Sequence, residues 1–127
     1  MLLISPNLGI SHPPGYSNGN CELAIVDVAQ LNTTFISVYR PPPPNASLSK
    51  FKDVLNRIRQ HTEQNKTAGK DFSIILSGDF NFPPTVVNWI ESEGSVFADP
   101  ARGTSVEKVA FQLLHDLAID LDLGSSG

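Results

Sequence analysis

Hydrophobic and polar positions divide the chain into segments with the lengths of strands and helices. Apolar and β-branched runs at 22–29 and 33–39 predict two strands, and the three residues between them predict a hairpin. Because nearly every position in both runs is apolar, we expect strands that are covered on both faces. A third apolar run at 72–77 predicts a buried strand that delivers a polar loop. A short strand-like run is also present at 2–5.

Other segments follow the period of an amphipathic helix. Ser47 predicts an N-cap, and the apolar stripe after it predicts a helix that ends by Gly69. A second helix is predicted at 105–121 and a short one at 85–91, whereas the segment 12–20 predicts a loop. The stripe of the first helix consists of Leu48, Phe51, Leu55 and Ile58.

Composition narrows the class of protein. A chain of 127 residues with 40% hydrophobic and 17% charged residues is that of one folded domain. A net charge of −4 argues against binding nucleic acid through bulk electrostatics. The single cysteine, Cys21, excludes an internal disulfide and a cysteine-based metal site. No stretch approaches the roughly 20 apolar residues of a membrane span, so we expect a soluble, intracellular protein with no membrane partner.

The strongest candidate for chemistry is the run Gly78-Asp79-Phe80-Asn81 at the end of the third strand. If the chain stays extended there, Asp79 and Asn81 project to the same side. A carboxylate can position or deprotonate an attacking water, and an amide can stabilise charge on a phosphoryl oxygen. This pair suits phosphoester hydrolysis. The alternative is an Asx-type turn, in which both side chains only satisfy backbone groups.

A second candidate lies at the end of the strand at 33–39. The Tyr39 hydroxyl and the Arg40 guanidinium are both able to donate to a phosphate. Their alternative roles are an ordinary strand aromatic and a solvated arginine. Four prolines follow Arg40, and we expect them to leave the sheet in extended polyproline form. The segment Tyr39–Pro44 also permits a different function, a non-catalytic interaction module read by an aromatic-lined groove.

Taken in order, these motifs resemble a known family. A strand ending in VYRPP (38–42), an amphipathic helix, and then IILSGDFNFP (74–83) resemble the endonuclease/exonuclease/phosphatase superfamily. More narrowly, they resemble the endonuclease domain of non-LTR (LINE-type) retrotransposons, which carries a similar helix after the second motif. The resemblance covers nearly the whole chain.

The resemblance implies a fold, an activity and a set of site residues. The fold is a four-layered α/β-sandwich, with two packed mixed β-sheets and helices outside. The activity is metal-dependent cleavage of phosphodiester bonds, with Mg²⁺ or Mn²⁺ as cofactor and DNA as the expected nucleic-acid partner. Asp79 matches the family aspartate that positions the nucleophile or accepts its proton. Asn81 matches the asparagine that contacts the scissile phosphate, and Tyr39 matches the tyrosine that hydrogen-bonds the phosphate region. Asp79 and Asn81 are thus the catalytic candidates, and Tyr39 and Arg40 are the substrate-binding candidates.

The chain also departs from the family pattern. The family places an asparagine on the first strand, a metal-binding glutamate after it and an Asp-His pair on the last strand, and this chain offers no match at those places. Glu22 resembles a non-catalytic strand glutamate of the family. We therefore expect residues 1–127 to be an internal portion of one domain, truncated at both ends, inactive alone, without an assignable metal ligand. In the full-length protein we expect fusion to a reverse transcriptase and a nuclear location.

A third class, the two-metal phosphoesterases, also places Gly-Asp at a strand end. Those enzymes need several His and Asp ligands in one chain. Three scattered histidines make this class a weak alternative here.

Overall fold

The protein is described by a computed structural model that covers residues 10–12, 14–92, 95–101 and 105–121. The strand-like run predicted at 2–5 lies outside the described residues. The main element is a mixed sheet of order β1-β3-β4-β5, with β2 also paired to β3. Its strands are β1 (Ile10–Ser11), β2 (Tyr16–Ser17), β3 (Glu22–Val28), β4 (Thr33–Tyr39) and β5 (Ser73–Asp79).

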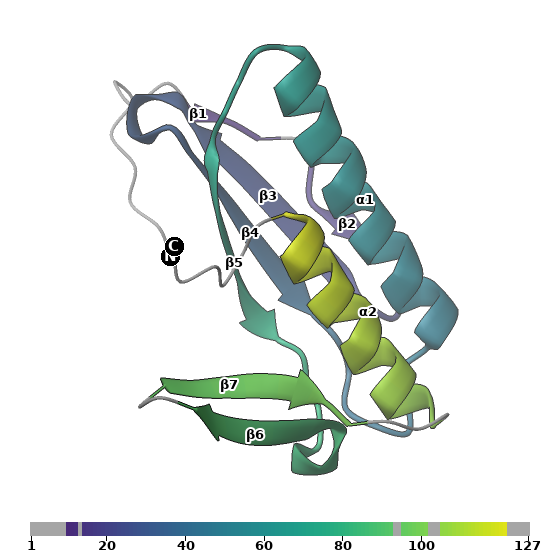
Figure 1. Ribbon diagram of the computed structural model, residues 1–127. Coiled ribbons are helices and arrows are strands. Elements are labelled where there is room, and N and C mark those ends of the chain that lie inside the picture. Colours follow the sequence, from purple (N-terminus) through teal and green to yellow (C-terminus); the bar gives the residue numbers. More distant parts are fainter. Residues whose placement is uncertain (1–9, 13, 93–94, 102–104, 122–127) are drawn as a thin grey trace.

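The centre of this sheet is the hairpin predicted from the sequence. β3 and β4 pair antiparallel along their whole length, and a short 3₁₀ turn, Ala29–Leu31, joins them. The turn closes at Asn32, whose φ of 48° is in the left-handed region that asparagine tolerates. β5 then pairs parallel to β4 after the chain has crossed over through a helix (Figure 1). The chain therefore leaves β4 and β5 at the same edge of the sheet.

Two helices cover one face of the sheet (Figure 1). They are α1 (Leu48–Thr67) and α2 (Val106–Asp120), which confirms both longer predicted helices. Ser47 caps α1 and Ser105 caps α2, each accepting a hydrogen bond from the backbone three residues on. The core forms where the two helices meet β3 and β4, and it includes Phe51, Leu55, Ile58 and Leu117. None of the helices among the described residues is both long enough and apolar enough to span a bilayer.

The prediction that the strands are covered on both faces is wrong for the described part of the chain. In β3 and β4 buried and more accessible residues alternate, and only the face under the helices is closed. On the other face Phe35 is half-buried and Ile75 is 51% exposed. We call this the open face. Apolar side chains on both faces misled the prediction, because composition does not show which face finds a partner.

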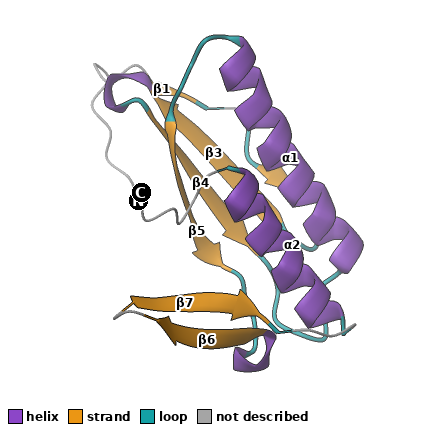
Figure 2. Cartoon of the chain, viewed as in Figure 1, coloured by secondary structure: helices purple, strands orange, loops and turns teal. Residues whose placement is uncertain are grey.

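The architecture is therefore mixed α/β, as predicted, with one main sheet and two helices. A separate hairpin of β6 (Val87–Ser92) and β7 (Ser95–Pro100) lies beyond the end of β5 (Figure 2). The helix predicted at 85–91 is wrong, because only a 3₁₀ turn, Pro84–Val86, precedes β6. Val87 and Ile90 are β-branched, and such residues favour a strand when a second strand is available to pair.

Two loops differ in detail from the expectation. The segment 12–20 includes the two-residue strand β2. The proline run does not stay extended, because Pro42 begins a turn that closes with a hydrogen bond from the Asn45 N–H to the Pro42 carbonyl, 3.1 Å long. The extended polyproline form that aromatic grooves recognise is therefore interrupted inside this segment.

Candidate functional site

Tyr39 and Asp79 are neighbours at the end of the sheet where β4 and β5 both finish. The two residues are paired in the parallel register of these strands. Side chains that are paired across adjacent strands lie on the same face, so both belong to the open face. Asp79 is exposed and Tyr39 is 38% exposed. A phenol and a carboxylate from two separate sequence motifs thus share one accessible surface.

Gly78 makes this close pairing possible. A Cβ atom at this position would lie 2.0 Å from the Val38 carbonyl oxygen, far inside van der Waals contact. Its φ of +153° is also in the region that side chains disfavour. The absence of a side chain at Gly78 therefore lets β5 run beside β4 as far as Asp79.

Asn81 reaches the same strand ends by a different route from the predicted one. β5 ends at Asp79 and Asn81 has a φ of 51°, so the chain is not extended across this pair. The Asn81 Nδ2 donates to the Arg40 carbonyl at 2.6 Å. Asn81 thus bonds the backbone of a distant strand end, which is neither the extended arrangement nor a local Asx-type turn. Its Oδ1 and second amide hydrogen have no hydrogen-bond partner among the described residues.

Arg40 turns into the protein instead of towards the exposed pair. Its side chain is only 1% exposed, and Nη1 donates to the Phe80 carbonyl at 3.0 Å. Nη2 forms an ion pair with Glu107 at the start of α2. In this position the guanidinium neither contacts solvent nor reaches the open face, so the structure shows neither of the two roles expected from the sequence, the phosphate donor and the solvated arginine.

Glu22 is an accessible residue of this region, although the sequence assigns it no catalytic role. It pairs with Tyr39 from the opposite side, so a row of Glu22, Tyr39 and Asp79 crosses three strands on the open face. A hollow of about 470 Å³ borders Glu22 and Tyr39 and extends to Tyr16. Counting outward from the hairpin pair Val28–Thr33 leads to the pair Glu22–Tyr39, so the predicted hairpin is enough to place Glu22 beside Tyr39.

The described residues do not form a metal cage. No group of three or more His, Cys, Asp or Glu side chains capable of holding a metal ion is found among them. Burial raises the pKa of the Cys21 thiol, while the nearby charges of Arg40 and Lys50 partly oppose the shift. The raised pKa disfavours the thiolate, and the thiol is fully buried, so nothing here indicates a reactive cysteine.

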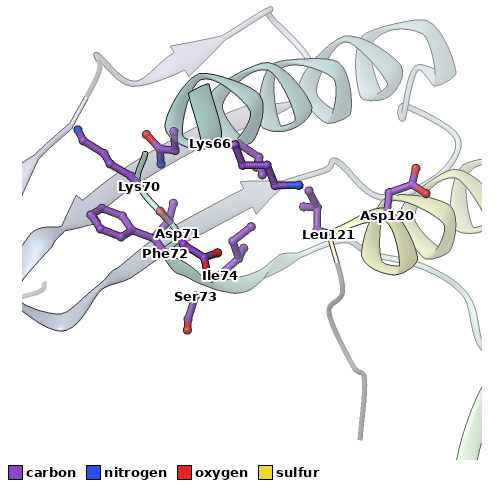
Figure 3. A pocket seen from close by; sticks show the side chains of 11 residues that line it. Lys66, Lys70, Asp71, Phe72, Ser73, Ile74, Asp120 and Leu121 are labelled. Atoms are coloured by element: carbon purple, nitrogen blue, oxygen red, sulfur yellow. The ribbon is translucent and has the colours of Figure 1, made fainter. Parts of the chain in front are cut away.

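A second hollow lies elsewhere (Figure 3). It encloses about 510 Å³ at the start of β5, between the C-terminal ends of α1 and α2. Lys66 and Lys70 line it, but so do Asp71 and Asp120, so its charges balance. This hollow lies at the opposite end of β5 from Asp79. We place the candidate site at Tyr39 and Asp79 because their side chains suit phosphate chemistry, although this hollow is larger than the one beside Tyr39.

Comparisons with known proteins identify no relative. Neither a protein-family model, nor a curated protein, nor a solved structure matches this chain.

Proposed function

We propose that this chain is an internal portion of a metal-dependent endonuclease domain that hydrolyses phosphodiester bonds, of the type found in LINE-type retrotransposons. The observation that carries the proposal is the pairing of Tyr39 with Asp79 at the carboxyl ends of two parallel strands, next to the Asn81 loop. In open α/β sheets, ligands bind at the carboxyl ends of the strands. Two sequence motifs that suit a phosphate thus meet at the edge where a ligand is expected.

Each side chain has a distinct part in the proposed reaction. The Asp79 carboxylate orients the attacking water and accepts its proton. The Tyr39 hydroxyl and the free hydrogen of the Asn81 amide donate to the non-bridging oxygens, where negative charge grows in the transition state. Mg²⁺ or Mn²⁺ would neutralise phosphate charge when bound. The described residues do not form a cage for it, so we derive no step through the metal.

The open face supports the larger fold implied by the resemblance. Its half-buried and exposed apolar residues, among them Phe35 and Ile75, suit a second sheet that packs about 10 Å away. We propose that this second sheet, supplied from outside the described residues, completes the four-layered sandwich. In the complete protein, DNA would be the substrate, a reverse transcriptase the fused neighbour, and the nucleus the location.

The test uses the chain together with whatever in-frame coding sequence flanks it. We expect this longer protein to nick supercoiled plasmid DNA in the presence of Mg²⁺, and we expect the 127-residue chain alone not to do so. Asp79→Asn should lower the nicking rate by about 10²- to 10⁴-fold, because it removes the proton acceptor.

The matched control is Asp71→Asn, which alters an exposed aspartate just before the other end of β5. Its nicking rate should equal that of the unaltered protein. Equal rates for Asp79→Asn and the unaltered protein would contradict the proposal, as would a gene without in-frame flanks.

A further inference from the structure

Arg40 contacts Asp79, Phe80 and Asn81 of the segment Gly78–Asn81, which we call the GDFN loop, and also Phe82 directly after it. Its own N–H donates to the Asp79 carbonyl at 2.8 Å, and its carbonyl accepts from the Asn81 amide at 2.6 Å. Its guanidinium donates to the Phe80 carbonyl at 3.0 Å and lies 4.5 Å from the centre of the Phe82 ring. One residue therefore holds the loop through backbone and side chain together.

The surroundings of the guanidinium fix it in place. A buried cation is unfavourable unless it is paired and hydrogen-bonded, and Arg40 is 1% exposed. Glu107 supplies the compensating charge from the first turn of α2. The Phe51 ring, from α1, lies 5.6 Å away. Within the described chain, Arg40 Nε and Glu107 Oε1 have no hydrogen-bond partner. The contact between Arg40 Nη2 and Glu107 Oε2 is therefore what joins the two side chains.

We propose that Arg40 is the positioning residue of the site: it sets the conformation of the GDFN loop, and its ion pair with Glu107 makes that conformation depend on the docking of α2. The importance of the loop for phosphate chemistry rests on the function proposed above. The positioning itself does not, because it is a statement about contacts within the chain.

The geometry favours arginine over lysine at this position. A planar guanidinium can donate to Phe80 and Glu107 at the same time while its face lies against the Phe82 ring. An ammonium group has one nitrogen and no plane, so it cannot meet all three demands. Arg40→Lys keeps the charge and should still release the loop.

The experiment follows the GDFN loop by NMR in the 127-residue chain, without any nucleic acid. In Arg40→Lys and in Glu107→Gln, we expect the backbone N–H of residue 40 to exchange with solvent at least about tenfold faster, because its partner, the Asp79 carbonyl, belongs to the released loop. The Asn81 amide resonances should move towards those of a solvated amide. The N–H of Ile36, in the middle of β4, should keep its protection.

The matched control is Arg59→Lys, because Arg59 and Asp120 also join α1 to α2 but are both exposed. Exchange at Arg40 and the Asn81 resonances should be unchanged in this variant. A change in Arg59→Lys equal to that in Arg40→Lys would overturn the proposal, because any weakening of the α1–α2 contact would then be enough.

A double variant, Arg40→Met with Glu107→Leu, separates positioning from folding. Replacing a buried ion pair by apolar side chains often preserves the fold. We expect a folded protein whose Asn81 resonances have moved. A folded double variant with unaltered Asn81 resonances would overturn the proposal.

The outcome is distinguishable from failure of the proposed function. If Asp79→Asn leaves nicking unchanged while Arg40→Lys releases the loop, the function is wrong and the positioning role stands. If both proposals hold, Arg40→Lys in the flanked protein should lower kcat by about tenfold or more with little change in KM, as expected of a residue that does not touch the substrate.

Discussion

At the scale of single residues, the close approach of β4 and β5 leaves no room for a side chain at position 78. A Cβ there would lie 2.0 Å from the Val38 carbonyl oxygen, which is backbone and cannot turn away. We expect Gly78→Ala to lower the free energy of unfolding by about 3 kcal/mol or more, through overpacking and backbone strain. Urea denaturation followed by circular dichroism measures this.

Gly15→Ala is the matched control for Gly78→Ala. A Cβ at Gly15 would have no atom within 4 Å, so this substitution should change the free energy of unfolding by less than about 0.5 kcal/mol. Equal effects at the two glycines would contradict the steric explanation.

The site residues differ in how far the sequence alone predicts their positions. Tyr39 and Asp79 lie at strand ends as predicted, because an apolar run that stops at polar residues is a local property of the sequence. The direction of Arg40 was not predictable in this way. Its burial depends on Glu107, 67 residues further along the chain, and on two aromatic rings. No local pattern encodes such a partner.

At the scale of elements, a buried polar cluster joins β3, β4 and α1 at the end of the sheet opposite to the candidate site. The Asp27 carboxylate accepts hydrogen bonds from Thr34 and Asn65, and it lies 2.8 Å from His61 Nε2. Asp27 and Thr34 are buried. Such a network stabilises the packing of its elements only when every member is satisfied.

Removing the central carboxylate should therefore destabilise the contact between helix and sheet. We expect Asp27→Ala to lower the free energy of unfolding by about 2–4 kcal/mol, because the buried Thr34 and the half-buried Asn65 lose their acceptor. Urea denaturation measures the effect, and Asp71→Ala, at an exposed carboxylate, should be close to neutral. A neutral Asp27→Ala would show that the cluster adds nothing to stability.

Most elements followed from the sequence, and the failures have physical causes. The two long helices and the β3–β4 hairpin were predictable because apolar period, N-caps and turn residues agree with the fold. The helix predicted at 85–91 is wrong because so short a segment holds too few periods to separate a helix from a strand, and the strand form of β6 depends on pairing with β7. Whether a sheet face is covered is likewise a tertiary property.

At the scale of the whole molecule, the acidic net charge limits the affinity that the chain alone has for nucleic acid. With a net charge of −4, the chain attracts a polyanion weakly, and the candidate site itself carries the acidic side chains Asp79 and Glu22. Under the proposed function, a phosphodiester would be recognised by short-range donors such as Tyr39 and Asn81. We expect weak but localised binding, with an apparent Kd of about 1–10 mM for a dinucleotide.

The most direct test of the central claim is an NMR titration of the 127-residue chain with thymidylyl-(3′,5′)-thymidine in the presence of Mg²⁺. The proposed site predicts shift changes concentrated at Tyr39 and 78–81, which saturate in the millimolar range. Shift changes concentrated at Lys66 and Lys70, in the hollow at the other end of β5, would contradict it. So would a spectrum that does not respond to the dinucleotide.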